Sequence, residues 1–179
     1  MRWVMPDDAV RFDGLRIGFV GLARSFVEDR EHSVLTVVDG GCVAMWRSPD
    51  WVQPPTPEPP AADAGADPGA APSPSPYPPD VQERWRILGE AIEMSHPHDE
   101  PHWYLNVLGT HPDRQGQGLG ARALGPMCAR FDEDGVAAYL ESSNPRNMTL
   151  YRRHGFVELD RTIDLPDGPR LYPMWRAPR

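Results

Sequence analysis

The chain has 179 residues and a mass of 20.0 kDa, which suits one ordinary domain and is short for two. Its formal net charge of -8 and its pI near 5.2 argue against a nucleic-acid groove or an anionic membrane surface as the main partner. No apolar run approaches the ~20 residues that span a bilayer, and the N-terminus lacks the pattern of a signal peptide, so we expect a cytoplasmic protein.

The first predicted element is an amphipathic helix over residues 14–29. Its apolar side chains recur at spacings of three and four, as one buried helical face requires: Leu15, Phe19, Leu22 and Phe26. Two strands follow at residues 34–38 and 42–46, and the Asp39-Gly40 step between them predicts a β-hairpin.

A proline-rich stretch comes next. Eleven of the 22 prolines lie between Pro54 and Pro79, in a segment with almost no large apolar residue. Such a segment cannot bury enough surface to offset the entropy of ordering it, which indicates a disordered insertion or linker over residues 53–80. A proline-rich ligand for another protein is the alternative. Residues 1–52 and 81–179 are then two parts of one domain.

The remaining elements alternate between helix and strand. Helices are predicted over residues 81–94, 118–133 and 145–154, and strands over 103–108, 136–140, 156–163 and 171–175. Pro126 should bend the second of these helices. The order predicts a mixed α/β domain. The side chains expected to face inward are Trp85, Leu88, Ile92, Leu119, Leu124, Cys128 and Phe131.

Cysteine and histidine supply weak signals. Cys42 and Cys128 form no CxxC pair, and in a cytosolic chain two such thiols are expected to be reduced and packed. His96, His98 and His102 lie in a Pro-broken connection without a fourth ligand at zinc spacing, so a solvated loop is favoured over a metal site.

The most informative stretch is Leu108 to Gly120, where a predicted strand runs into a glycine-rich loop that opens a helix. Glycines at 116, 118 and 120 allow a ligand to approach the backbone, and a helix N-terminus offers unpaired N–H groups with a positive dipole end. The combination predicts a site for phosphate or pyrophosphate.

Three other interpretations of this loop were compared. A P-loop is excluded because the chain contains no lysine. A dinucleotide fingerprint has different glycine spacing, although Glu141 does follow about twenty residues on. A plain glycine-rich turn does not account for Arg114 and Gln115 preceding three alternating glycines.

The loop resembles the acetyl-CoA loop of the GNAT N-acetyltransferase superfamily, whose pattern [Q/R]-x-x-G-x-[G/A] matches Gln115 to Gly120. Glu141 to Asn147 and Leu150 to Phe156 are similar to that family's later signature. The resemblance spans roughly residues 96–178 and, more weakly, 3–51. Within the superfamily it is nearest to the puromycin N-acetyltransferase-like group, through Trp103-Tyr-Leu, Pro126, Tyr139-Leu-Glu-Ser-Ser and Gly168 to Met174.

The resemblance implies the GNAT acyl-CoA N-acyltransferase fold, a mixed and mostly antiparallel sheet flanked by helices. Members begin with a strand and a helix before the helix expected at residues 14–29, so this first unit is missing from the sequence. We expect that the natural start lies upstream, and that the strand at 34–38 is an exposed edge.

The resemblance also implies roles for individual residues. Tyr151 matches the general acid that protonates the leaving thiolate, and Glu141 is the candidate base that takes the proton of the amine. A packing role for Tyr151 and a surface or capping role for Glu141 remain open. Asn106 either lines the acceptor cleft or faces solvent. The predicted acetyl-CoA-binding residues are Leu108, Gly109, Thr110, Arg114, Gln115, Gly116, Gln117, Gly118, Leu119, Gly120, Asn144 and Asn147, with a backbone N–H near Leu108 as oxyanion donor.

The predicted function is therefore transfer of an acetyl group from acetyl-CoA to the primary amine of a small molecule, by direct attack without a covalent enzyme intermediate or a metal. The alternatives are a catalytically silent acyl-CoA-binding protein and an acetyltransferase for protein N-termini or lysines. We expect no nucleic-acid or membrane partner, and a homodimer stays open.

Overall fold

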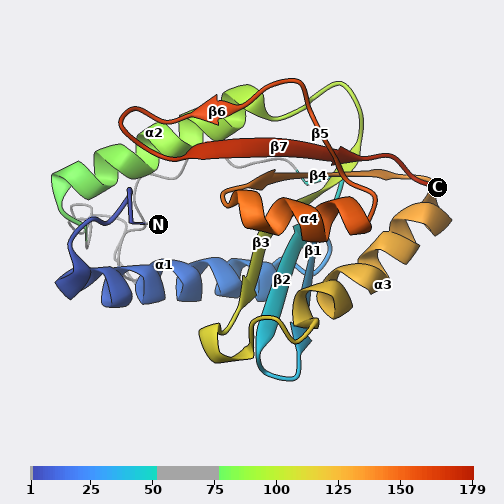
Figure 1. Cartoon of the computed structure of the whole chain (residues 1–179), viewed down its shortest axis with the longest axis horizontal. Coiled ribbons are helices and arrows are strands. Elements are labelled where there is room, and N and C mark those ends of the chain that lie inside the picture. Colours follow the sequence, from blue (N-terminus) through green and yellow to red (C-terminus); the bar gives the residue numbers. More distant parts are fainter. Residues whose placement is uncertain (1, 52–76) are drawn as a thin grey trace, which may run out of the picture.

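The computed structural model describes residues 2–51 and 77–179. In this part of the chain one sheet is flanked by four helices (Figure 1). The elements are α1 (Asp8–Glu28), β1 (Ser33–Val38), β2 (Cys42–Arg47), α2 (Pro79–Ser95), β3 (His102–Thr110), the 3-10 turn η1 (Pro112–Arg114), α3 (Leu119–Asp134), β4 (Ala137–Ser142), α4 (Pro145–Arg153), β5 (Val157–Glu158), β6 (Ile163–Asp164) and β7 (Arg170–Arg176).

The seven-stranded sheet has the order β1-β2-β3-β4-β7-β5, with β6 also paired to β7. Only β3 and β4 run parallel, and the other neighbours are antiparallel. The predicted mixed and mostly antiparallel α/β fold is confirmed. Within the described residues β1 is the first strand and lies at the sheet edge, where Val37 is 60% exposed.

Two helix boundaries extend beyond their predicted positions for local reasons. α1 begins at Asp8 because the side chain of Asp7 caps it by accepting a hydrogen bond from Ala9 N. α2 begins at Pro79, since proline suits the first turn of a helix. The predicted insertion at 53–80 otherwise falls mostly outside the described residues.

The single strand predicted over residues 156–163 is wrong. Val157 and Glu158 pair with Trp175 and Met174, whereas Ile163 and Asp164 pair with Leu171 and Arg170. Residues 159–162 therefore lie opposite only residues 172–173 of β7. The two extra residues interrupt the pairing and separate β5 from β6.

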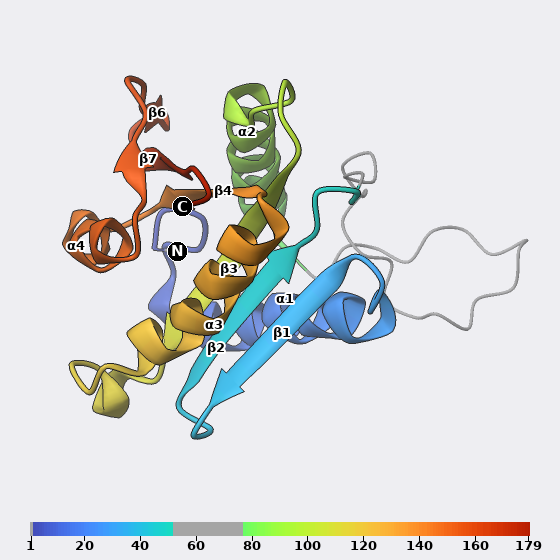
Figure 2. The same cartoon turned by 90° about the vertical axis from the view of Figure 1, so that its right-hand side faces the viewer.

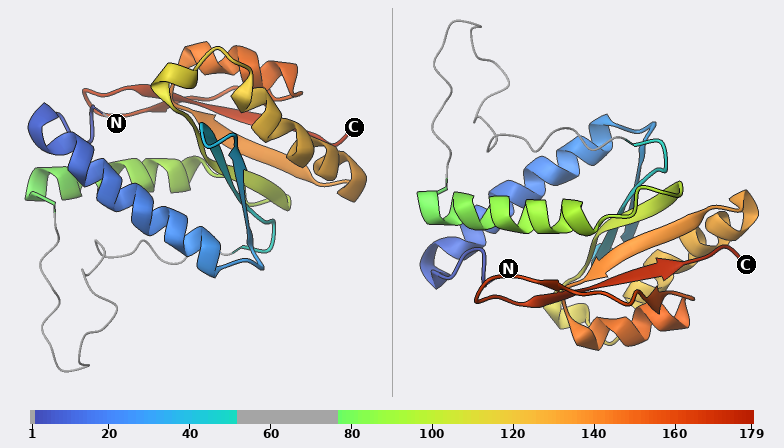
Figure 3. Two further views of the ribbon diagram at one scale, coloured as in Figure 1. Left: turned by 90° about the horizontal axis from the view of Figure 1, so that it is seen from below. Right: turned by 90° about the horizontal axis from the view of Figure 1, so that it is seen from above.

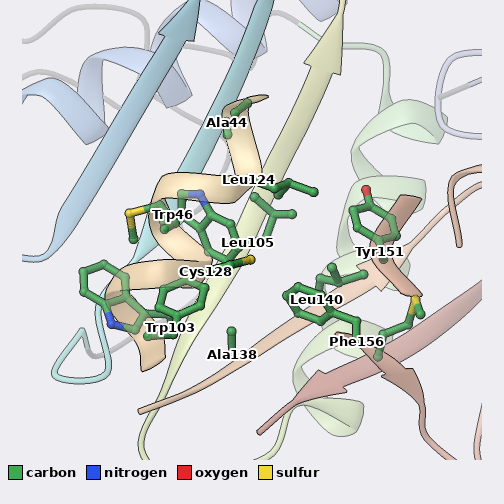
Figure 4. Packing of buried hydrophobic residues seen from close by; sticks show 14 of the residues in the cluster. Ala44, Trp46, Trp103, Leu105, Leu124, Cys128, Ala138, Leu140, Tyr151 and Phe156 are labelled. Atoms are coloured by element: carbon green, nitrogen blue, oxygen red, sulfur yellow. The ribbon is translucent and has the colours of Figure 1, made fainter. Parts of the chain in front are cut away.

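The helices cover the two faces of the sheet unequally. α3 lies in front of the β1–β2 hairpin and α1 behind it (Figure 2), and α4 lies across β4 and β7 from α2 (Figure 3). The main apolar core fills the α3 and α4 face (Figure 4). Within it, Trp46 packs edge-on against Phe131, with 5.0 Å between the ring centroids. Four predicted inward residues of α3 belong to this core: Leu119, Leu124, Cys128 and Phe131.

The α1 and α2 face is more open. Of the apolar residues expected to form the buried face of α1, only Phe26 is buried, and Phe19 remains 38% exposed. Trp85, Leu88 and Ile92 of α2 are only partly buried. These faces pack only partly and border a cavity.

Candidate active site

The sheet opens in its middle, between its two parallel strands. β3 and β4 pair only over three residue pairs, His102 with Ala137, Trp103 with Ala138 and Tyr104 with Tyr139. Beyond Tyr104 and Tyr139 the strands continue unpaired with each other, to Thr110 and to Ser142. Backbone groups on the facing edges of this gap are therefore available to a ligand.

A β-bulge shapes the β3 side of the gap. Met45 pairs with Val107 and Trp46 with Leu105, which leaves Asn106 as the extra residue. A bulge re-aims the side chain and backbone at its position and is frequent beside functional sites. Asn106 lines the cavity described below.

A cavity of about 1140 Å³ joins this gap to the α1 and α2 face. Its lining comes chiefly from α1, α2, β3, β4 and α4. It includes Leu15, Phe19, Leu22, Trp85, Leu88, Ile92, Asn106, Leu108, Glu141, Asn147 and Tyr151. Most of these side chains are apolar, and the size fits a pocket for a small organic ligand. Sequence patterning missed the α1 and α2 walls because a cavity-facing stripe and a core-facing stripe have the same helical period.

The glycine-rich loop lies at the end of β3, just outside the residues that line the cavity. Gly116 and Gly118 have φ angles of +74° and +75°, which L side chains rarely adopt, and a Cβ at either position would meet nothing within 4 Å. Gly118 is the N-cap of α3, and no side chain of the described residues caps that helix. The loop thus presents open backbone at a helix N-terminus, as an anion site requires.

Side chains of the loop bond to one another and to neighbouring backbone carbonyls. Arg114 Nε donates to Gln117 Oε1 at 3.0 Å, Gln117 Nε2 donates to the Asp113 carbonyl at 3.2 Å, and Gln115 Nε2 donates to the Thr110 carbonyl at 3.3 Å. Gly120 packs closely on the α4 side, since a Cβ there would lie 3.1 Å from Leu150 Cδ2. These contacts hold the loop shape and leave the backbone exposed.

Glu141 is buried at the end of β4. Its side chain is 5% exposed, and its Oε2 accepts a 2.8 Å hydrogen bond from the Tyr104 hydroxyl. Burial raises the pKa of the Glu141 carboxyl to about 7, against the lowering effect of that hydrogen bond. A surface position for Glu141 is excluded, and a carboxyl that titrates near neutrality can take up and release a proton.

Tyr151 approaches the cavity from α4. The residue is 6% exposed, and its hydroxyl points away from Leu140 and Phe156 (Figure 4). Burial raises the pKa of the Tyr151 phenol to about 12, so the group keeps its proton at neutral pH. Tyr151 both packs in the core and lines the cavity, and the two sequence-based interpretations are compatible.

The two predicted asparagines have different surroundings. Asn144 is the N-cap of α4, where its Oδ1 accepts from Arg146 N at 3.1 Å. Asn147 is exposed and lines the cavity. Of the predicted site residues, the cavity lining includes Leu108, Glu141, Asn147 and Tyr151, and it does not include Gly109, Thr110, Asn144 or the loop residues 114–120.

The solvated-loop interpretation of the histidines is wrong for two of the three. The side chain of His96 is 15% exposed and His102 is buried, whereas His98 is 65% exposed. His96 and His102 pack against Tyr139, with ring centroids 5.0 Å and 5.7 Å away. Among the described residues no group of His, Cys, Asp and Glu is arranged to hold a metal ion. Cys42 and Cys128 are free and buried, as predicted.

Comparison with known proteins links this geometry to one family. The model of the Acetyltransferase (GNAT) family matches residues 46–156, which hold β3, the glycine-rich loop, α3, β4 and α4. An uncharacterised N-acetyltransferase of Schizosaccharomyces pombe is 36% identical over 59 residues, which are 33% of this chain and 24% of that protein.

Two solved structures give similar matches over part of their length. One is described as histone acetyltransferase HPA2 and related acetyltransferase from Corynebacterium glutamicum, with 28% identity over 78% of this chain and 58% of that one, and a TM-score of 0.49. The other is the ribosomal-protein-S18-alanine N-acetyltransferase from Escherichia coli, with 30% identity over 42% of this chain and 54% of that one, and a TM-score of 0.38. The chain thus spans about a quarter of the curated relative and little more than half of either solved chain.

Proposed function

We propose that this chain, which belongs to the GNAT acetyltransferase family, transfers an acetyl group from acetyl-CoA to the primary amine of a small molecule with an apolar body. The observation that carries the proposal is the cavity that joins the gap between β3 and β4 to the apolar walls of α1 and α2. One end of the cavity borders a loop suited to pyrophosphate, and the other end is large and apolar enough for an acceptor.

Binding of the donor would use the glycine-rich loop and the unpaired edge of β3. Backbone N–H groups from Gln115 to Gly120 would bind the pyrophosphate, and Arg114 would add a charged contact. The pantetheine arm would lie along Leu108, Gly109 and Thr110, in the gap that β4 leaves open. Acetyl-CoA supplies the activated acetyl group, and the residues of this chain bind and orient it.

Catalysis would require two proton transfers, and the cavity contains a group suited to each. Glu141 would accept the proton of the attacking amine, and Tyr151 would donate one to the departing thiolate. A backbone N–H near the bulge at Asn106 and Leu108 would stabilise the oxyanion. Because the amine attacks the thioester directly, proximity and orientation of the two substrates supply much of the rate.

Three finer assignments belong to the same proposal. Within the family we place the chain nearest to the puromycin N-acetyltransferase-like group, on the motif residues quoted above. The free thiols of Cys42 and Cys128 fit a reducing cytoplasm. The described helices include none long and apolar enough to cross a membrane. Self-association into a homodimer stays a prediction.

The test combines calorimetric binding of acetyl-CoA with a thiol-release assay across a panel of amines. The panel should pair each apolar amine with a short polar amine and with a peptide N-terminus. We expect binding of acetyl-CoA, and turnover that is fastest for the apolar amines. Binding without turnover for any acceptor would favour the silent alternative, and preference for the peptides would favour a protein acetyltransferase.

A further inference from the structure

A chain of hydrogen-bonding groups leads from Glu141 away from the cavity. His96 Nδ1 lies 4.0 Å from Glu141 Oε1, and His96 Nε2 lies 3.0 Å from His102 Nε2. His102 Nδ1 in turn lies 2.7 Å from the backbone carbonyl of Glu100. The chain ends at a second cavity of about 410 Å³, which His96, His98, Glu100 and His102 help to line.

The backbone carbonyl of Glu100 determines which nitrogen of each histidine ring carries a hydrogen. A carbonyl oxygen only accepts, so His102 Nδ1 carries a hydrogen and donates it to Glu100. Burial lowers the pKa of His102, and it lowers the pKa of His96 to about 4, so both rings are neutral at pH 7. His102 Nε2 is then an acceptor, and His96 Nε2 donates to it.

The remaining nitrogen, His96 Nδ1, therefore carries no hydrogen, and its lone pair faces Glu141. His96 Nδ1 and Glu141 Oε1 are both buried, and neither has a hydrogen-bond partner among the described residues. An ionised Glu141 would place two acceptors against each other, whereas a protonated Glu141 can donate its proton to His96. Closing the 4.0 Å separation by about 1 Å gives an ordinary hydrogen bond.

We propose that Glu141, His96 and His102 form a proton relay that carries the proton of the acceptor amine out of the active site to the second cavity. Glu141 takes the proton from the amine nitrogen. The carboxyl O–H bond then breaks as a bond forms to His96 Nδ1, the His96 Nε2–H bond breaks as the hydrogen moves to His102 Nε2, and His102 releases a proton to solvent. One proton has then moved from the amine to water, and His96 carries its hydrogen on Nδ1 instead of Nε2. Exchange of ring hydrogens with solvent in the second cavity returns both histidines to their starting tautomers before the next turnover.

The groups around the relay favour transfer of the proton and do not stabilise a charged histidine. Tyr104 donates to Glu141, and Tyr139 donates to the Ser95 carbonyl at 3.4 Å, which also accepts from Arg161 at 2.9 Å. Three further titratable groups line the second cavity: Glu93, His98 and Glu100. Buried rings with lowered pKa values give up a proton readily, so neither histidine would trap the charge.

The inference rests on the proposed function, and kinetics of His102 variants provide the first test. His102→Phe keeps a packed ring and removes both nitrogens, so kcat should fall about tenfold or more while the KM values for both substrates stay unchanged. His102→Ala should lose as much, and added imidazole should restore its turnover. His32→Gln is the control, because this histidine pairs with Asp29 and lines neither cavity, and its kcat should equal that of the wild type.

A second readout does not depend on turnover. Nitrogen chemical shifts of 15N-labelled histidine report the tautomer of each ring, and we expect hydrogen on Nε2 of His96 and on Nδ1 of His102 at pH 7. A charged His96, or hydrogen on its Nδ1, would overturn the relay. Unchanged kcat in His102→Phe, or failure of imidazole to rescue His102→Ala, would do the same. A wild-type protein without turnover would contradict the proposed function, and the tautomers would still decide the relay.

Discussion

The hydroxyl of Tyr104 donates a 2.8 Å hydrogen bond to Glu141 Oε2 at the point where β3 and β4 separate. Tyr104 forms the last parallel pair with Tyr139, and Glu141 lies two residues beyond Tyr139 on β4. The carboxyl is thus buried where the gap between β3 and β4 begins, and its pKa of about 7 lies near neutral pH.

Glu141→Gln should make stability less sensitive to pH. The folded-state pKa of Glu141, about 7, exceeds its ordinary value, 4.5, so the wild type loses stability as pH rises between these values and is level above them. The variant lacks this loss. Its free energy of unfolding, relative to that of the wild type, should therefore rise by up to about 3 kcal/mol between pH 4.5 and pH 8. Denaturant unfolding at the two pH values measures the difference, and a constant difference would contradict the raised pKa.

The same group should control the pH dependence of catalysis. Because Glu141 acts as a base only when ionised, kcat/KM of the wild type should rise with pH to a plateau above its pKa of about 7. In Glu141→Gln this limb should disappear and the plateau should fall by about 10²-fold or more. Affinity for acetyl-CoA, measured by calorimetry, should not change. A retained limb would assign the base to another residue.

Tyr151→Phe should separate chemistry from binding. The phenol keeps its proton because burial raises its pKa to about 12, and removal of the hydroxyl should lower kcat by about 10²-fold or more. The ring remains, so packing against Phe156 and the affinity for acetyl-CoA should be retained. Tyr172→Phe is a suitable control, because Tyr172 packs against the same core and does not line the cavity. An equal rate in Tyr151→Phe and the wild type would exclude Tyr151 as the acid.

Gly118→Val should abolish acetyl-CoA binding. Gly118 holds φ +75° in open space, where a side chain would be strained and would cover the backbone N–H groups of the loop. Gly135→Val is a closely matched control, since Gly135 ends the same helix with φ +66° and also has open space around it. Both variants should lose similar stability in thermal unfolding, and only Gly118→Val should lose binding in calorimetry. Equal affinity in the two variants would refute the loop assignment.

Leu22→Ala should weaken binding of an apolar amine. Leu22 lines the cavity, and loss of its side-chain contacts should cost about 1 kcal/mol, which raises the KM for the amine about fivefold. Val20 lies two residues away on α1, is 53% exposed and does not line the cavity, so Val20→Ala should leave this KM unchanged. If both variants behave alike, the acceptor does not contact α1.

The sequence was sufficient to predict most of the local elements and the loop. Asp39-Gly40 predicts the hairpin, and the glycines at 116, 118 and 120 predict the open backbone at the start of α3 that the structure shows. These features depend on backbone sterics of neighbouring residues, which a single sequence expresses directly.

The features that depend on distant residues could not be predicted. The stripe of Leu15, Phe19 and Leu22 has the period of a buried helix, and only the arrangement of α1 and α2 shows that it borders a cavity. Likewise, His96 and His102 sit in a polar, proline-containing segment, and their burial depends on Tyr139 and Trp175 from other strands. The bulge at Asn106 needs the register of β2 against β3.

The central claim is direct acetyl transfer in this cavity, and the most direct measurement is the ratio of acetylated amine to released CoA thiol. Both products should be quantified in one reaction, by mass spectrometry and a thiol reagent, with wild type and Tyr151→Phe in parallel. We expect a ratio near one in the wild type and slow formation of both products in the variant. Thiol release without acetylated amine, or no release with any amine, would contradict this claim.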